Sequence, residues 1–466
     1  MLDVRGKRIH VIGLGAKGTG RACAQVLGGM GAQITISDTK APQELAGEIA
    51  QLGDASVRLQ LGAGEAYRDI ETADMVVPSP GVPMASEAIQ RALQAGVPVY
   101  SEIELAGRLA QAPLVAITGT KGKTTTTTLI GLLLAALGKT THVGGNIGVP
   151  LIELAAKAKA DDLLVAEVSS FQLEAVEEFH PHVAVFTNLY PDHLDRYHES
   201  MDEYMAAKLN IFARQTAKDF AIINIDRPEH ERVIAATQAQ IIPVSMVRSV
   251  PGGVYLRGGE IVSEIGGTAH VLLQVSAIRL RGAHNVGNTM QALAAVEVLG
   301  LPVADIATAT LANFRGVPNR LEEVDTINGV AFYNDSQGTT PMAVRMALQA
   351  FVATPPVLIA GGRAKIKDFS ELGADIVAGT KAVILIGEAA GDIATAIRRA
   401  NPFFPIYFAH SLEEAVQQGN FLATPAGVVL LSPGCASFDM FRNMEHRGDV
   451  FRASVAKCIK DRKFEE

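Results

Sequence analysis

The chain has 466 residues, of which 48% are hydrophobic and 19% charged, with a formal net charge of −8. This length predicts about three domains. The high hydrophobic and low charged fractions predict large buried sheets and exclude a disordered chain. The net negative charge argues against non-specific nucleic-acid binding. Three cysteines without metal-type spacing indicate a reducing compartment.

The N-terminal segment predicts a small doubly wound sheet. Strands are expected at residues 8–12, 33–37, 57–61, 75–77 and 97–100, alternating with helices. The glycine turn at 13–18 and Asp38, after the second strand, form a dinucleotide-type fingerprint. We interpret it as a site for a ligand with phosphate and ribose, with NAD as the obvious alternative. Ser79 and Gly81 follow the fourth strand, where either a ligand-binding turn or a purely structural turn would fit.

The stretch at 118–138 joins an apolar strand (114–117) to an apolar helix through Gly-Thr-Lys-Gly-Lys-Thr. Such a turn exposes backbone N–H groups to phosphate, Lys123 can reach a terminal phosphate, and the Thr124 hydroxyl can bind the accompanying Mg²⁺. The motif is one glycine short of the full eight-residue pattern, because Ile117 stands six positions before Lys123. A run of five threonines is poor helix material, so helix stability does not explain the turn.

Polar residues follow the next two predicted strands. The strand at 163–168 contains Glu167, and the strand at 183–187 precedes Asn188, Asp192 and His193. A carboxylate and an imidazole at neighbouring strand ends could complete a metal shell around a triphosphate. The alternative for Glu167 is a surface charge, although the apolar residues before it predict a buried strand, where an unpaired carboxylate is costly.

A capping box, Ser200 with Glu203, predicts a helix at 201–213 that places Tyr204 and Lys208 on one face. A lone lysine on a helix is usually a solvated charge. A strand is expected at 220–225, and short β runs at 241–278 predict some antiparallel pairing. His284 and Asn285 open a further helix, where the amides of Asn285 and Asn288 read a purine edge or cap the helix.

The C-terminal segment again alternates strands with helices, with strands expected at 330–333, 357–360, 382–386, 406–409 and 428–431. Polar residues gather after three of these strands, at 334–339, 361–365 and 432–439. Three such loops on one sheet edge predict a binding site. Arg320 lies just after the expected hinge and could reach a phosphate. The predicted fold is therefore α/β in three domains, with Rossmann-like first and last domains and a central phosphate-loop domain that contains some antiparallel β structure.

Together these motifs resemble the Mur ligases of peptidoglycan synthesis over the whole chain. The resemblance rests on the phosphate loop, the segments at 144–148, 167–174 and 192–197 with Lys208 downstream, and the segments at 284–288, 318–322, 334–336, 361–365 and 432–451. It implies domains at 1–110 for the UDP substrate, 111–316 for ATP and 317–466 for the amino acid. The implied enzyme is a cytoplasmic, monomeric, ATP-dependent ligase that adds D-glutamate to UDP-N-acetylmuramoyl-L-alanine through an acyl phosphate, without nucleic acid or membrane insertion.

The resemblance also implies the site residues. Lys123, His193, Lys208, Arg320 and Asp335 are the expected catalytic residues, with Thr124, Glu167, His193 and a carbamylated Lys208 on Mg²⁺. ATP is expected at Gly119, Thr120, Lys121, Gly122, Lys123, Thr124, Thr125, Asn288, Arg320 and Asp335. The UDP substrate is expected at Gly15, Ala16, Lys17, Asp38, Thr39, Ser79, Gly81, Asn146 and His193. The amino acid is expected at Thr339, Lys365, Ser437, Phe438 and Met444.

Two residues depart from the family pattern. Gln337 stands where a lysine is usual, and Met444 stands where a phenylalanine is usual. A lysine at 337 is expected to lower the Michaelis constant for D-glutamate about tenfold, or ~1.4 kcal/mol, unless Arg363, Lys365 or Lys367 already supplies the charge.

Three rival functions stay open at this stage. A nicotinamide oxidoreductase would use only the first glycine turn and leave the phosphate loop unexplained. Another Mur-type or folylpolyglutamate-type ligase would share the ATP half of the site. A non-catalytic nucleotide-binding module would bind ATP without releasing phosphate.

Overall fold

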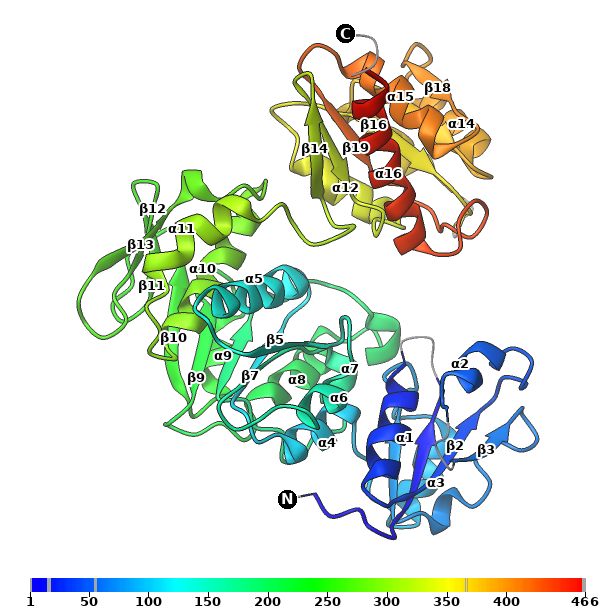
Figure 1. The fold of residues 1–466 in the computed structure, drawn as a ribbon, viewed down its shortest axis with the longest axis vertical. Coiled ribbons are helices and arrows are strands. Elements are labelled where there is room, and N and C mark those ends of the chain that lie inside the picture. Colours follow the sequence, from blue (N-terminus) through cyan, green and yellow to red (C-terminus); the bar gives the residue numbers. More distant parts are fainter. Residues whose placement is uncertain (1, 15–17, 54–56, 365, 367, 463–466) are drawn as a thin grey trace. The chain divides into compact units, whose positions relative to one another are not determined.

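The computed structural model describes residues 2–14, 18–53, 57–364, 366 and 368–462 (Figure 1). The chain divides into two compact units, which are Met1–Ile278 with His284–Ala312, and Arg279–Ala283 with Asn313–Glu466. The first unit contains a four-stranded and a nine-stranded sheet, and the second contains a six-stranded sheet. The predicted α/β class with three sheets is confirmed. Among the described helices, none combines the length and the apolarity needed to cross a membrane.

The first sheet is wholly parallel, in the order β3-β2-β1-β4. Its strands are β1 (Arg8–Ile12), β2 (Gln33–Asp38), β3 (Val57–Leu61) and β4 (Met75–Pro78). Its helical segments are α1 (Thr19–Gly29), α2 (Ala46–Ala50), η1 (Ile70–Thr72) and α3 (Glu87–Gln94). The fifth strand predicted at 97–100 is wrong: only Val99 bridges to β4, because Ser101 then caps the next helix and the chain leaves the sheet.

The second sheet has the order β13-β12-β11-β10-β9-β8-β5-β7-β6. Its strands are β5 (Leu114–Thr118), β6 (Thr141–Gly145), β7 (Leu163–Glu167), β8 (Val183–Phe186), β9 (Phe220–Asn224), β10 (Gln240–Ser245), β11 (Val254–Arg257), β12 (Glu260–Ser263) and β13 (His270–Gln274). The pairs β11–β12 and β12–β13 are antiparallel, which confirms the mixed pairing expected in this region. The edge strand β6 was not predicted, since its sequence is polar and rich in glycine.

The helical segments that accompany this sheet are α4 (Glu102–Leu109), α5 (Lys123–Ala136), α6 (Leu151–Ala155), α7 (Ser170–Leu173), η2 (Leu194–Tyr197), α8 (Met201–Leu209), η3 (Asn210–Phe212), α9 (His230–Ala235), η4 (Val275–Ala277), α10 (Ala283–Glu297) and α11 (Ala304–Asn313). The helix predicted at 201–213 is thus an α-helix followed by a 3₁₀ turn. Ser200 caps α8 through the Glu203 N–H, but the Glu203 carboxylate contacts His198 Nδ1 at 2.9 Å. The complete capping box lies at α7 instead, between Ser169 and Gln172.

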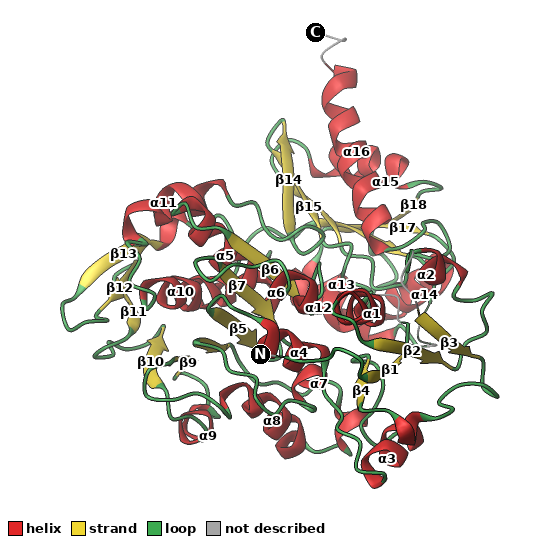
Figure 2. Cartoon of the chain, turned by 60° about the horizontal axis from the view of Figure 1, so that its bottom comes forward, coloured by secondary structure: helices red, strands yellow, loops and turns green. Residues whose placement is uncertain are grey.

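The sheet of the second unit has the order β14-β15-β19-β16-β17-β18, and only β14 runs antiparallel to its neighbour. Its strands are β14 (Glu322–Ile327), β15 (Val330–Asn334), β16 (Val357–Gly361), β17 (Ala382–Ile386), β18 (Ile406–Phe408) and β19 (Val428–Leu431). Its helices are α12 (Pro341–Gln349), α13 (Ser370–Gly379), α14 (Ala390–Ala400), α15 (Leu412–Ala423) and α16 (Met444–Arg462). Helix α16 packs beside β14 and β15 (Figure 2). Strand β14 was not predicted, because acidic residues interrupt its apolar alternation.

Candidate functional site

The glycine loop at 119–122 connects the fully buried strand β5 to helix α5. Gly119 has φ 136° and Gly122 has φ 85°, a region that side chains disfavour. A Cβ atom on Gly119 would lie 2.0 Å from Thr187 Oγ1, and one on Gly122 would lie 2.4 Å from Asn288 Oδ1. Both the backbone conformation and the close packing therefore require glycine, and the loop places its N–H groups at the start of α5.

Two lysines converge on this loop. Lys123 Nζ donates to the carbonyl oxygens of Gly119 and Thr120 at 3.0 Å each, and Lys208 Nζ donates to the same Gly119 oxygen at 2.7 Å. The Lys208 side chain is fully buried and lies over the Tyr204 ring. Burial, and then the nearby charge of Lys123, hold the pKa of Lys208 well below its usual value. The expectation that a lone lysine on a helix is a solvated charge is therefore wrong for Lys208.

A buried carboxylate lies beside the loop. Glu167 ends β7, which pairs with β5, and its side chain is 2% exposed. Its two oxygens accept hydrogen bonds from Thr124 Oγ1 at 2.7 Å and from Asn146 Nδ2 at 2.8 Å. The prediction that Glu167 is buried next to the phosphate loop is confirmed, and its alternative as a surface charge is excluded. Carboxylate and hydroxyl oxygens are ligands that suit Mg²⁺, so this pair fits such an ion.

His193 lies in the loop after β8, which is the other neighbour of β5 in the sheet. It has φ 55°, its side chain is half exposed, and its ring packs edge-on against Phe171 with centroids 5.0 Å apart. Within the described residues it makes no hydrogen bond with Glu167 or Lys208, and no group of three His, Cys, Asp or Glu residues suited to a metal was found there. Its neighbour Asp192 contacts Lys121 Nζ at 3.0 Å.

The other residues expected to bind ATP surround the same loop. The Thr120 hydroxyl donates to the Tyr190 carbonyl at 3.2 Å, and the Lys121 N–H donates to Asn188 Oδ1 at 2.9 Å. Thr125 is half-buried in the first turn of α5.

Asn288, on α10, is buried against Gly122 and donates to Asn285 Oδ1 at 3.1 Å. Asn288 therefore contacts the loop directly, and Asn285 orients its amide.

The residues expected at the UDP substrate are described only in part, since Gly15, Ala16 and Lys17 lie outside the described residues. Asp38 accepts hydrogen bonds from the N–H groups of Leu14 at 3.1 Å and Lys40 at 3.0 Å. Ser79 Oγ donates to the Gly13 carbonyl at 2.8 Å. Thr39 and Gly81 are exposed. The turn after β4 thus lies against the glycine turn after β1.

The second unit gathers a polar cluster at the carboxyl ends of three neighbouring strands. β15, β19 and β16 are adjacent in the sheet, which confirms that the loops after them share one edge. Asp335 is buried, and its carboxylate accepts from Ser432 Oγ at 2.7 Å and from the Leu321 N–H at 3.3 Å. Burial raises the pKa of Asp335 to about 7, against the smaller opposing effect of these hydrogen bonds.

Arg320 and Gln337 are joined by a hydrogen bond from Arg320 Nε to Gln337 Oε1. The turn that carries Arg320 is clamped further, because Asn319 accepts from the Gln337 N–H at 3.0 Å. Asn319 and Leu321 both have positive φ, 64° and 43°. The arginine therefore stands on a constrained turn, which is tied to the loop expected to hold the amino acid.

The remaining residues expected at the amino acid lie around the same edge, apart from Lys365, which lies outside the described residues. Ser437 is buried, Phe438 is 64% exposed, and Thr339 is half-buried. The Met444 carbonyl accepts from Ser336 Oγ at 2.7 Å.

Of the cations weighed as replacements for the missing lysine, Arg363 is paired with both carboxylate oxygens of Glu388, at 2.9 and 3.1 Å.

Arg447 was not singled out from the sequence, although it belongs to the quoted segment at 432–451. Its guanidinium is fully buried and donates to Ser336 Oγ at 3.0 Å, to the Ser336 carbonyl at 2.8 Å and to the Cys435 carbonyl at 3.2 Å. It therefore holds two loops of the edge together. Its position inside a dense motif was the only sequence signal, since burial of an arginine depends on the fold.

A stability test follows from the raised pKa of Asp335. The folded protein binds this proton up to about pH 7, whereas the unfolded chain releases it near pH 4. The wild-type protein therefore loses stability, relative to a variant with a neutral amide at this position, as the pH rises between these values. We expect Asp335→Asn to raise the unfolding temperature of the second unit more at pH 8 than at pH 5, by about 2–4 °C for each 1 kcal/mol. Calorimetry at both pH values measures this difference. The exposed carboxylate variant Asp392→Asn is the control, and an equal shift at both pH values would contradict the expectation.

The glycine loop, its two lysines and the buried Thr124–Glu167 pair define a nucleotide-binding α/β protein of the phosphate-loop type. Three family models match successive parts of the chain: "Mur ligase MurD-like, N-terminal domain" over residues 7–101, "Mur ligase middle domain" over 117–296, and "Mur ligase, glutamate ligase domain" over 319–435. The chain belongs to the Mur ligase family, whose members are ATP-dependent ligases that form amide bonds.

The curated relatives cover nearly the full chain. It is 42% identical over 460 residues to a UDP-N-acetylmuramoylalanine--D-glutamate ligase of Pelotomaculum thermopropionicum, covering 98% of this chain and 99% of the relative. It is also 42% identical over 454 residues to the ligase of the same name from Geotalea uraniireducens, covering 97% and 98%. These relatives agree with the resemblance drawn from the motifs.

Solved structures show the same fold at lower identity. A UDP-N-acetylmuramate-alanine ligase of Thermotoga maritima aligns with TM-score 0.59 and 20% identity, over 97% of this chain and 100% of that chain. A folylpolyglutamate synthase of Mycobacterium tuberculosis aligns with TM-score 0.55 and 18% identity, over 75% of this chain and 94% of that chain. At these identities the likeness describes the fold alone.

Proposed function

We propose that this chain joins the amine of D-glutamate to the alanine carboxyl group of UDP-N-acetylmuramoyl-L-alanine, with conversion of ATP to ADP and phosphate. The names of the relatives, at 42% identity over 98% of the chain, support this substrate pair. The observation that carries the catalytic half is the buried Glu167 carboxylate beside the glycine loop, which accepts hydrogen bonds from Thr124 and Asn146. The enzyme acts as a cytoplasmic monomer.

The proposed division of labour follows the three sheets. Residues 1–110 bind the UDP substrate, with Asp38, Thr39, Ser79 and Gly81 on the described part of the edge. Residues 111–316 bind ATP through the glycine loop and Asn288. Residues 317–466 bind D-glutamate, with Thr339, Ser437, Phe438 and Met444 around it, and supply Arg320 and Asp335 to the nucleotide.

The chemistry requires two displacements, because a carboxylate is a poor electrophile. A carboxylate oxygen of the alanine first attacks the γ-phosphorus of ATP, and ADP leaves. The amine nitrogen of D-glutamate then attacks the acyl carbon, phosphate leaves from the tetrahedral intermediate, and the nitrogen loses a proton. Lys123 neutralises charge on the transferring phosphoryl group, and the N–H groups at the start of α5 orient it.

Magnesium is expected to accompany the nucleotide. Thr124 and Glu167 would hold one ion, which neutralises phosphate charge when bound. Lys208 could help to hold a second ion only if its amine carried an oxygen ligand, since an amine does not suit Mg²⁺. The lowered pKa of Lys208 favours the neutral, nucleophilic form of its amine. It can therefore attack carbon dioxide and lose one proton, which leaves an anionic carbamate that would act with His193.

The test is phosphate release measured across a matrix of acceptors and amino acids. We expect release only when ATP, UDP-N-acetylmuramoyl-L-alanine and D-glutamate are all present. Release with UDP-N-acetylmuramic acid and alanine, or with a folate acceptor and L-glutamate, would assign the chain to another ligase of the same fold. ATP binding without release in any mixture would indicate a non-catalytic module.

The departure at Gln337 has its own test. A lysine there would add a cation near the D-glutamate carboxylate, and a charge-assisted hydrogen bond is roughly twice as strong as a neutral one. We expect Gln337→Lys to lower the Michaelis constant for D-glutamate about tenfold, or ~1.4 kcal/mol. Because Gln337 also accepts a hydrogen bond from Arg320, we expect the constant for ATP to rise slightly. Steady-state kinetics with each substrate varied measures both, and an unchanged or raised constant for D-glutamate would show that the charge is supplied elsewhere.

A further inference from the structure

Arg196 links two sequence-distant parts of the first unit. It lies in η2, three residues after His193, and its side chain is only 11% exposed. Arg196 Nε and Nη2 donate to the two carboxylate oxygens of Glu174, at 2.9 and 2.6 Å. This two-point contact fixes the plane of the guanidinium.

The same guanidinium reaches the turn after β4. Arg196 Nη1 donates to the Pro80 carbonyl at 3.0 Å, and Nη2 donates to the Val82 carbonyl at 3.1 Å. These two carbonyls flank Gly81. On its other side the turn is held to the glycine turn after β1, by the Ser79 Oγ contact with Gly13 at 2.8 Å. The orientation of the turn therefore depends on Arg196 on one side and on Gly13 on the other.

Arg196 also connects to His193 through an aromatic ring. The guanidinium carbon lies 4.2 Å from the centroid of the Phe171 ring, and the same ring packs edge-on against the imidazole of His193 at 5.0 Å. The Arg196 N–H donates to the His193 carbonyl at 3.1 Å. One side chain thus sets the position of the turn at 79–82 relative to His193.

We propose that Arg196 is a positioning residue for the UDP-linked substrate, which holds the turn at 79–82 in register with His193. This inference rests on the proposed function, in which the turn binds that substrate, and on the substrate contact that the family resemblance implies for His193. Lysine cannot replace arginine here, because a single ammonium group does not span two carboxylate oxygens and two carbonyl oxygens that lie on different segments. Arg196 touches no residue of the glycine loop in the described structure, so its effect falls on the acceptor and not on ATP.

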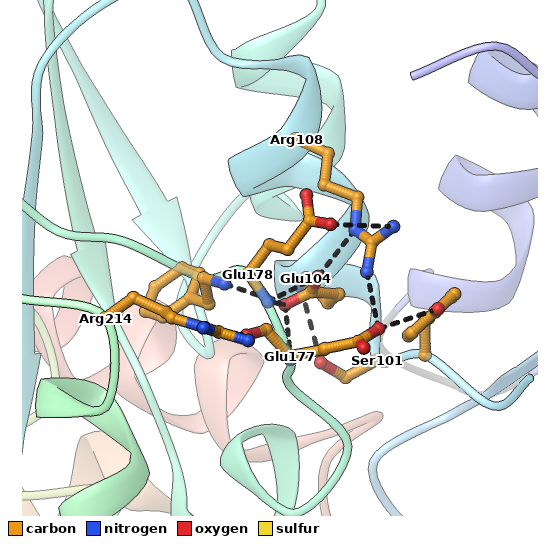
Figure 3. A network of polar contacts seen from close by, with 8 residues as sticks. Ser101, Glu104, Arg108, Glu177, Glu178 and Arg214 are labelled. Carbon is orange, nitrogen blue, oxygen red and sulfur yellow. Dashed lines mark hydrogen bonds and ion pairs between the residues drawn. The ribbon is translucent and has the colours of Figure 1, made fainter. Parts of the chain in front are cut away.

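A matched control lies in the same unit. Arg108 is also nearly buried, at 17% exposed, and it also joins sequence-distant segments (Figure 3). It contacts Glu104 at 2.6 Å and Glu177 at 3.0 Å, and it lies over the Tyr100 ring. Glu104 in turn accepts the N–H groups of residues 177–179 (Figure 3). None of these residues is expected at the substrate, so Arg108→Lys reports the cost of losing a buried guanidinium alone.

The experiment compares Arg196→Lys, Glu174→Gln and Arg108→Lys with the wild type, by Michaelis constants for UDP-N-acetylmuramoyl-L-alanine, ATP and D-glutamate and by unfolding temperature. We expect Arg196→Lys to raise the constant for the UDP substrate about tenfold or more, with the constant for ATP changed less than about twofold. Glu174→Gln, which keeps both hydrogen bonds from Arg196 to the turn, should raise it less. Arg108→Lys should lower the unfolding temperature and change the three Michaelis constants by similar factors.

The outcomes are distinct. If Arg196→Lys and Arg108→Lys change the three constants alike, or if the constant for ATP rises as much as that for the UDP substrate, Arg196 is only a structural residue and the inference fails. If Arg196→Lys does not fold, Glu174→Gln is used instead. The inference then fails if Glu174→Gln raises the constant for ATP as much as that for the UDP substrate. If the wild type releases no phosphate with this substrate pair, the proposed function fails first, and that result is seen before any variant is compared.

Discussion

Lys123→Ala is expected to reduce phosphate release at least about 100-fold and to leave the fold intact. The lysine begins α5, and its Nζ lies over the glycine loop on the carbonyl oxygens of Gly119 and Thr120. Loss of a group that stabilises charge in a transition state typically costs about 10²–10³ in turnover. Alanine has a higher helix propensity than lysine, so the start of α5 should survive. Turnover is measured by phosphate release, and the fold by circular dichroism and the unfolding temperature.

Lys139→Ala is the matched control for this variant. Lys139 is exposed just beyond the other end of α5. Its replacement by alanine removes the same charge from the chain without changing the glycine loop. We expect it to retain the activity of the wild type. Near-normal phosphate release by Lys123→Ala would mean that the loop binds a nucleotide without taking part in the chemistry.

Lys208→Ala is the second variant expected to be inactive. The wild-type amine is buried against Gly119 and shares that carbonyl with Lys123. Burial, and then the charge of Lys123, lower its pKa, which favours the neutral form that reacts with carbon dioxide. If its carbamate supplies an oxygen ligand, a short carboxylic acid should occupy the cavity left by the side chain. We therefore expect acetate or formate to restore part of the activity of Lys208→Ala in a concentration-dependent way.

The specificity of this rescue is the control. The same acids should not restore Lys123→Ala, since that variant lacks a cation and not an anionic oxygen. Native mass spectrometry of the wild type should show the added mass of one carbon dioxide, which disappears in Lys208→Ala. Full activity of the alanine variant without any acid would show that Lys208 only packs against the loop.

The strands were the easiest part of the fold to predict. Strands β1, β3, β17 and β19 have the predicted bounds. β17 and β19 are wholly apolar runs, and β1 and β3 are short runs in which apolar residues recur between polar ones. The edge strands β6 and β14 were missed, since they lack such a run. The extra strand at 97–100 was predicted from an apolar run, but the chain turns into α4 immediately afterwards.

The candidate site was predictable to a similar degree. The glycine loop follows from spacing alone, because glycines between a buried strand and a helix have few other uses. The position of Glu167 at the same sheet edge as the phosphate loop was predicted, since parallel strands present their carboxyl ends at one edge. Its hydrogen bond with Asn146 was not predicted, because Asn146 follows β6, a strand that was missed. The roles of Arg196 and Arg447 could not be predicted, as each depends on partners that lie far away in the sequence.

The α/β class, the position of the phosphate loop and the family could be predicted from the amino-acid sequence, because local spacing of glycine, lysine and apolar residues encodes these features. Which charged side chains are buried away from water depends on the packing of the folded chain. The tertiary structure placed Lys208 and Lys123 on one carbonyl oxygen, enclosed Asp335 beside Ser432, and buried Arg196 between Glu174 and the turn at 79–82. Desolvation and neighbouring charge depend on every segment that packs around a side chain, and such packing is not a property of any local stretch of sequence.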